Sequence, residues 1–149
     1  MKALVVYDSV YGNTEKIARA IGSGISDDTK VLRTGDVSPI DLESLELLIV
    51  GAPTYGGRPT PAMKEFLKQL PASAAKDIDV AAFDTRISAK WVGIFGYAAG
   101  KIARSLKKMG GNLLVNPEGF FVKGTEGPLK DGELERAAAW AHEIMRNRK

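Results

Sequence analysis

The chain has 149 residues, of which 44% are hydrophobic and 26% charged, and its formal net charge at pH 7 is +3. A chain of this size and composition fits one ordinary globular domain, so we expect residues 1–149 to form a single domain. The absence of cysteine excludes disulfides, thiolate-held iron–sulfur clusters and a cysteine nucleophile. No apolar stretch approaches the length of about 20 residues that a membrane span needs, and we expect a cytoplasmic protein.

Five apolar runs alternate with stretches of helical periodicity. The runs cover residues 3–7, 29–34, 47–52, 79–83 and 112–116. The central runs lack the polar alternation of a sheet with one face in water, which predicts strands that are covered on both faces. Strands alternating with helices in one domain predict a doubly wound, mostly parallel α/β sheet.

Two of the expected helices have clear start signals. Thr60 followed by Pro61 is an N-cap and first-turn pair, and the apolar positions after it repeat at helical spacing. Asp131 can cap a final helix, which we expect to bury Leu134, Ala138, Ala141 and Met145.

The loop "DSVYGNT" follows the first strand, and parallel α/β sheets bind ligands at the carboxyl ends of their strands. A helix beginning near Asn13 exposes backbone N–H groups and a partial positive charge. Gly12 allows close approach of an anion, and Ser9 and Thr14 can donate hydroxyl hydrogen bonds to it. Because the loop has neither the lysine of a nucleotide P-loop nor the GxGxxG spacing, it predicts a monophosphate site. The alternative is that Ser9 and Thr14 only cap the helix.

The loops after the third and fourth strands add flat rings. In "APTYGGRPTP", Tyr55 can stack on a planar ligand while the backbone of Gly56 and Gly57 approaches the edge of that ligand. The loop "DTRISAKWVGIFGYAAG" brings three aromatic residues, Trp91, Phe95 and Tyr97. Trp91 can equally anchor its own loop. The three loops together predict a ligand with a phosphate at one end and a planar heteroaromatic group at the other.

With these loops the sequence resembles the flavodoxin-like family. The resemblance rests on "SVYGNT" after the first strand, on "PTYGG" after the third, and on chain length and strand order over nearly the whole chain. It implies a five-stranded parallel sheet of order 2-1-3-4-5 in a three-layer sandwich, with FMN bound noncovalently. The segment "NLLVNPEGFFVKGTEGPLKDGE" has little room for the insertion that interrupts the fifth strand of long-chain members, so a short-chain form is expected.

The resemblance also assigns residues to the cofactor. The residues expected to hold the phosphate are Ser9, Val10, Tyr11, Gly12, Asn13 and Thr14. The residues expected to line the flavin ring are Pro53, Thr54, Tyr55, Gly56 and Gly57 on one side, and Asp84, Thr85, Phe95, Gly96 and Tyr97 on the other. Gly56 is the candidate for a peptide that turns over on reduction, because positive φ costs glycine little.

The function that the resemblance implies is electron transport by an FMN flavoprotein, without catalytic residues of its own, that exchanges electrons with a redox partner protein or reductase. Arg58, Arg86 and Lys90 stand where classical members surround the ring with acids. We therefore expect a less negative second reduction potential and a partner with an acidic docking surface. The alternatives are an FMN-dependent NAD(P)H or quinone oxidoreductase and a scaffold that binds no flavin.

Other kinds of site fit the sequence less well. Asp8 and Asp84 both end strands, but a metal-binding phosphoacceptor site would need an aspartate where the chain has "GAPT". His142, the one histidine, lies far in sequence from the loops, and no spacing supports a Ser-His-Asp triad. The basic residues of "KIARSLKKMGG" have no interleaved aromatics, so we interpret them as a solvated helix face. We expect neither a metal nor a nucleic-acid ligand, and the sequence leaves the oligomeric state open.

Overall fold

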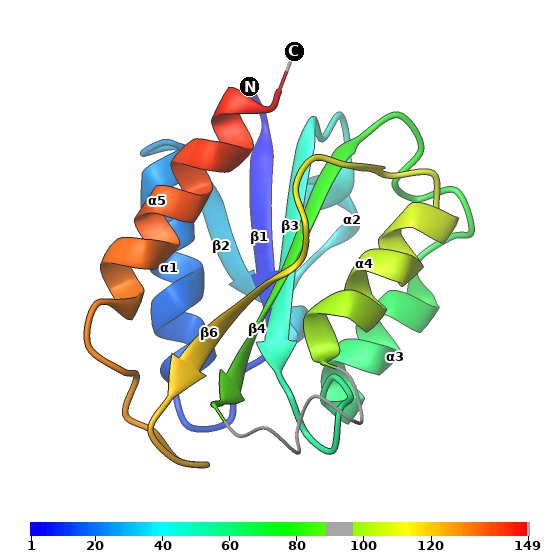
Figure 1. Cartoon of the computed structure of the whole chain (residues 1–149). Coiled ribbons are helices and arrows are strands. Elements are labelled where there is room, and N and C mark those ends of the chain that lie inside the picture. Colours follow the sequence, from blue (N-terminus) through cyan, green and yellow to red (C-terminus); the bar gives the residue numbers. More distant parts are fainter. Residues whose placement is uncertain (89–96, 149) are drawn as a thin grey trace.

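The computed structural model describes residues 1–88 and 97–148, and its centre is one parallel sheet (Figure 1). The strands run along the sheet in the order β2-β1-β3-β4-β5, and β6 pairs with β4 beyond the end of β5. Their bounds are β1 Ala3–Tyr7, β2 Lys30–Arg33, β3 Leu47–Pro53, β4 Asp79–Ile87, β5 Asn112–Leu113 and β6 Glu118–Val122. Every pairing between these strands is parallel, which confirms the predicted order 2-1-3-4-5.

Helices cover both faces of the sheet and complete a three-layer sandwich (Figure 1). On one face lie α1 (Asn13–Ile25) and α5 (Glu133–Arg146), and on the other lie α3 (Pro61–Gln69) and α4 (Ala98–Lys108). A 3-10 turn at Thr34–Asp36 and the short helix α2 (Pro39–Leu42) connect β2 to β3. None of the helices in the described residues has the length and hydrophobicity needed to cross a membrane.

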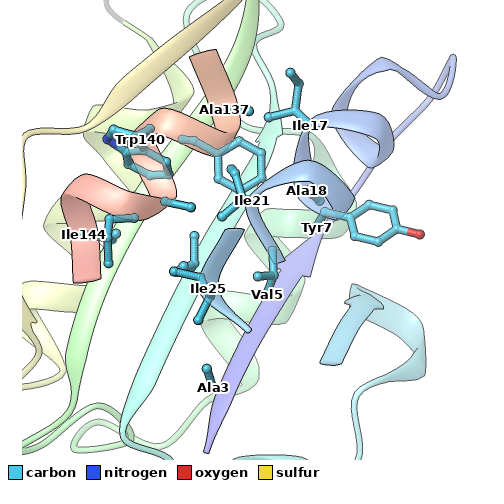
Figure 2. Close-up of a cluster of buried hydrophobic side chains, with 14 of the residues drawn as sticks. Ala3, Val5, Tyr7, Ile17, Ala18, Ile21, Ile25, Ala137, Trp140 and Ile144 are labelled. Atoms are coloured by element: carbon cyan, nitrogen blue, oxygen red, sulfur yellow. The ribbon is translucent and has the colours of Figure 1, made fainter. Parts of the chain in front are cut away.

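Burial on both faces explains why the central strands read as unbroken apolar runs. All five residues of β1 are buried, with alternate side chains in the two cores. Figure 2 shows the core between β1, α1 and α5, where Val5, Ile21 and Trp140 lie among the packed side chains. In the same core, Phe83 and Phe120 pack edge to face against the Trp140 ring, with centroids 6.1 and 5.9 Å from it.

The fifth strand of the family fold is divided in two. The predicted strand 112–116 ends after Leu113 as β5, and β6, which the sequence did not predict, pairs with β4 from Phe83 onward. The break spans only residues 114–117 and ends at Pro117, which has no N–H group to donate to a sheet. This break is too short to contain the insertion that is expected of a long-chain form.

Strand β4 is four residues longer than predicted. It continues through Asp84, Thr85 and Arg86 to Ile87, although these polar residues predicted a loop. They remain in the strand because β6 and, as far as Thr85, β3 supply backbone partners on its two sides. Buried contacts also satisfy the polar side chains.

The last helix differs from the prediction at its start and in its buried face. Gly132, at φ 84, is the N-cap in place of Asp131, and Leu134 is exposed. The buried residues are Glu133, Ala137, Trp140, Ala141 and Ile144. Glu133 turns inward because its carboxylate accepts a hydrogen bond of 2.7 Å from the Phe121 amide at the edge of β6 and pairs with Arg136. The buried face thus includes Trp140 and Ile144, which the sequence analysis did not select, together with the inward Glu133.

Asp41 gives the fold a pH-dependent contribution to stability. Its carboxylate accepts hydrogen bonds from the Ser38 amide at 2.8 Å and from Lys30 Nζ at 3.1 Å, which lower its pKa to about 2. Because this pKa lies below that of the unfolded chain, the stabilisation is complete above the unfolded value and is lost as the pH falls toward the folded value.

We expect Asp41→Asn to lower the Tm at pH 7, and the difference in Tm from the unsubstituted protein to narrow between pH 5 and pH 3. Thermal melts followed by circular dichroism measure this difference, and a constant difference would show that the charge contributes nothing.

Candidate functional site

A cavity of about 210 Å³ opens at the carboxyl ends of β1, β3 and β4. Its walls come from the loops after β1 and β3, from the end of β4, and from the segment after β6. Thus two of the three loops that the sequence selected meet at one edge of the sheet, together with the end of β4 where the third was expected to begin.

The first wall is the loop before α1. Five of the residues predicted for the phosphate line the cavity, namely Ser9, Val10, Tyr11, Asn13 and Thr14. Gly12, at φ 90, is the N-cap of α1, and it is not among the lining residues. A side chain added at Gly12 would meet no protein atom within 4 Å, so the positive φ, more than crowding, favours glycine here.

No side chain in the described part of the chain caps the start of α1. The Ser9 hydroxyl accepts a hydrogen bond of 3.1 Å from Gly12 N, and the buried Thr14 hydroxyl lies 2.8 Å from that of Thr85. Neither residue caps the helix, so the capping alternative is wrong. In contrast, Thr60 caps α3 by accepting from Met63 N. The positive end of α1, where Asn13 and Thr14 line the cavity, therefore has no side-chain cap among the described residues, which suits an anion.

The second wall is a tight turn after β3. Tyr55 and Arg58 exchange two backbone hydrogen bonds of 2.8 and 2.9 Å, and between them Gly56 and Gly57 have φ values of 54 and 76. Two successive positive φ angles are typical of a type I′ turn, which demands residues such as glycine. Lys101 of α4 donates to the Gly57 carbonyl at 2.6 Å and ties the turn to the helix.

The rim of the cavity carries two exposed tyrosines, Tyr11 and Tyr55. Burial, together with nearby Tyr11 and Asp8, raises the pKa of the Tyr55 phenol. Tyr55 is therefore neutral at pH 7, and its ring is available to stack on a planar ligand. Pro53, Thr54, Gly56 and Gly57, the other residues predicted for this side of the ring, also line the cavity.

The third wall differs from the prediction. Thr85 lines the cavity, but the Asp84 side chain has no exposed surface and lies behind the wall. Arg86, which also lines the cavity, donates to both Asp84 oxygens at 2.7 and 2.8 Å and lies 3.4 Å from the centre of the Tyr97 ring. Tyr97 thus supports Arg86 and is not a lining residue. Lys90, Trp91, Phe95 and Gly96 fall outside the described residues.

Asp84 also fixes the start of α4. Its Oδ2 accepts a hydrogen bond of 2.9 Å from Ala99 N, and the Thr54 hydroxyl accepts one of 3.1 Å from Ala98 N. Burial raises the pKa of Asp84, while Arg86 and the Ala99 amide act in the opposite direction. The start of α4 is therefore capped by side chains from β4 and from the loop after β3.

The fourth wall was missed by the sequence analysis. Val122 ends β6, and Thr125 lies in a turn that closes with a hydrogen bond of 2.9 Å from Gly127 N to Gly124 O. Asn13 holds this turn by donating to the Glu126 carbonyl at 3.1 Å. The sequence signal for this wall is the run "KGTEG", which follows the apolar segment of β6. The run can be recognised as a loop at the carboxyl end of a strand only if β6 is first predicted to be a strand.

Among the described residues, no group of three or more His, Cys, Asp and Glu is placed to hold a metal ion. Asp8, which directly follows β1, accepts hydrogen bonds from the Thr60 hydroxyl and from Arg33. It thereby joins β1, β2 and the start of α3.

A family model described as Flavodoxin matches residues 5–140. The chain belongs to the flavodoxin family. Among solved structures, a flavodoxin from the domain Archaea is 27% identical with a TM-score of 0.81, and the match covers 98% of this chain and 97% of that one. Flavodoxin 1 from Bacillus cereus is 19% identical with a TM-score of 0.82, and the match covers 100% of both chains.

A third match is to part of a larger protein. Rubredoxin oxygen:oxidoreductase from Desulfovibrio gigas is 20% identical with a TM-score of 0.76, and the match covers 97% of this chain but 35% of that one. At this identity the likeness concerns the fold, which this chain shares with one portion of a longer chain.

FMN is the cofactor of the flavodoxin family, and the cavity fits it chemically. At one end are the uncapped start of α1 and the hydroxyls of Ser9 and Thr14, which suit a phosphate. At the other end are Tyr55 and the two-glycine turn, which suit a planar ring approached closely by backbone.

We expect Thr14→Val to weaken FMN binding by about 1 to 3 kcal/mol, the range for losing a hydrogen bond to a charged group. Quenching of flavin fluorescence on binding gives the Kd. Riboflavin, which has no phosphate, is the control ligand, and its affinity should change less than that of FMN. Equal losses for the two ligands would place Thr14 away from the phosphate.

We expect Gly12→Val to weaken FMN binding more than Thr14→Val does, because the left-handed φ of Gly12 strains a branched residue and shifts the first turn of α1. The matched control is Gly132→Val. Gly132 is the N-cap of α5 at φ 84, and a side chain there would also meet nothing within 4 Å. Both variants should lose thermal stability, but only Gly12→Val should lose FMN affinity. Full FMN affinity in Gly12→Val would mean that the loop is merely a turn.

Proposed function

We propose that this flavodoxin-family chain is an electron carrier whose redox centre is noncovalently bound FMN. The observation that carries the proposal is the pairing, in one cavity, of an uncapped helix start with a tyrosine and a two-glycine turn. Of the described residues that line this cavity, only Arg86 is charged, and Asp84 already neutralises it. FMN, when bound, supplies reversible one-electron and two-electron chemistry, and the protein supplies binding and electrostatic environment.

We propose that the residues from Ser9 to Thr14 bind the phosphate through hydroxyl and backbone N–H groups. Residues Pro53 to Gly57 and Thr85 lie along the ring, and Gly56 is the residue whose peptide turns over on reduction. Its positive φ within a type I′ turn supports this role, because the alternative peptide orientation is also accessible to glycine.

The partner of the carrier is a redox protein or reductase with an acidic docking surface. The support for this choice is the charge at the rim of the cavity, where Arg58 is exposed next to the Gly56–Gly57 turn. A positive rim attracts a negative partner and speeds its diffusional encounter.

The second candidate is an FMN-dependent NAD(P)H or quinone oxidoreductase, favoured by the same positive charge, since these substrates include anions. A direct experiment separates the two. The FMN-loaded protein is mixed with NADH or NADPH and a quinone, and nicotinamide absorbance is followed. We expect no sustained turnover. Steady oxidation of the nicotinamide would show that the protein is an oxidoreductase and not only an electron carrier.

We expect Arg58→Glu to make the second reduction potential of the bound flavin more negative. Reduction adds negative charge to the ring, which a nearby cation stabilises, and for an exposed side chain screening limits the effect to about tens of millivolts. Arg86 contributes less because it is paired with Asp84. Spectroelectrochemistry at low and high salt measures the shift, with Arg146→Glu on α5 as the control for net charge. An unchanged potential in Arg58→Glu would show that Arg58 does not sense the flavin.

A further inference from the structure

The charge of the protein is unevenly divided between its two helical layers. Helix α4 carries four basic residues and no acid. On the same face of the sheet, α3 carries Lys64, Lys68 and Glu65, and α2 carries Asp41. On the opposite face, α1 and α5 together carry four basic and four acidic residues. The excess positive charge therefore lies on the α3–α4 layer.

The α4 charges are directed outward. Arg104, Lys107 and Lys108 are exposed, while Ile102, Ala103 and Leu106 on the other side of the helix are buried. None of these three basic side chains forms an ion pair within the described residues. Unpaired exposed charges of one sign along a helix about 16 Å long create a positive stripe, which we call the α4 face.

Helix α4 starts at the FMN cavity, and the α4 face lies along the second half of the helix. Ala98 N donates to Thr54 in the cavity wall, Ala99 N donates to Asp84 behind that wall, and Lys101 donates to the Gly57 carbonyl of the rim turn. These three contacts fix the position of the helix relative to the cavity mouth. Arg104, the member of the α4 face nearest the cavity, lies about 9 Å along the helix from Ala98. A protein that covers the length of α4 therefore also reaches the mouth, where Arg58 adds positive charge.

We infer that the α4 face is a docking surface for an acidic protein and brings that protein to the mouth of the FMN cavity. The inference rests on the proposed function as an electron carrier, since a carrier must form brief complexes with its partner. Complementary charge suits such complexes because it accelerates encounter without requiring a large apolar interface. A protein is favoured over a nucleic acid because α4 carries no aromatic residue on which bases could stack.

The experiment uses the FMN-loaded protein, reduced by one electron pair with dithionite, and two oxidised probes of opposite charge, an acidic ferredoxin of higher potential and the basic cytochrome c. Stopped-flow absorbance gives the bimolecular rate of electron transfer from the protein to each probe over a range of ionic strength. We expect the rate with the acidic probe to fall as salt increases, and the rate with the basic probe to rise or stay constant.

Charge reversal locates the surface. Lys108→Glu and Arg146→Glu change the last residue of α4 and of α5 by the same charge, so they share net-charge and helix-end effects. We expect Lys108→Glu and Arg104→Glu to slow transfer to the acidic probe about three- to tenfold at low salt, while Arg146→Glu changes it less than twofold. The α4 variants and the unsubstituted protein should converge at high salt.

A binding readout separates docking from redox effects. Titration of ¹⁵N-labelled oxidised protein with the acidic probe should shift the amide resonances of α4 and leave those of α5 in place. Equal effects of the three substitutions, a salt-independent rate, or shifts confined to α5 would overturn the docking surface while leaving the carrier function intact. Tighter binding of a single-stranded oligonucleotide than of the acidic probe would also overturn it. No electron transfer to any probe would instead overturn the proposed function.

Discussion

The carboxylate of Asp84 has no contact with solvent, and its charge has to be balanced inside the protein. An isolated buried charge is costly, whereas one that is paired and hydrogen-bonded is tolerated. Arg86 and the first turn of α4 supply the balance, so the position of the carboxylate fixes both. The guanidinium in turn lies against Gly119 of β6, where an added Cβ would sit 2.1 Å from Arg86 Nε. One buried acid thus connects the cavity wall, the start of α4 and the sheet edge.

The two helices that start nearest the cavity differ in whether side chains cap their first turn. The start of α4 is capped by Thr54 and Asp84, which satisfies its N–H groups from within the protein. The start of α1 has no side-chain cap in the described residues, and Gly12 holds the chain there at a positive φ. Capping both would leave no anion site, and capping neither would leave α4 without fixed orientation. The difference supports the proposal that α1 binds the ligand, while α4 belongs to the scaffold that carries the α4 face.

Much of this arrangement is readable from the sequence, because the patterns are local. Continuous apolar runs identify β1 and β3, and the hydroxyls around Gly12 identify a loop that lines the cavity. The errors come from residues whose partners are distant in sequence. Glu133 faces inward where it bonds Phe121 and Arg136, and Asp84 lies in a strand between β3 and β6 with Arg86 as its partner. Thr125 reaches the cavity through a turn that Asn13 holds, a contact between residues more than a hundred positions apart.

The fold does not determine which partner binds, because partner choice depends on surface residues. In this protein the surface charge differs between the two helical layers. The core positions of α1 and α4 obey the same packing requirement, since each helix buries an apolar side against the same sheet. Their outward sides are free of that requirement, and they differ in charge: balanced on α1 and α5, positive on α4. Such an imbalance does little for stability, because like charges on one helix repel each other. It therefore agrees with a function at that surface, and an acidic partner is the one that the charge of α4 would attract.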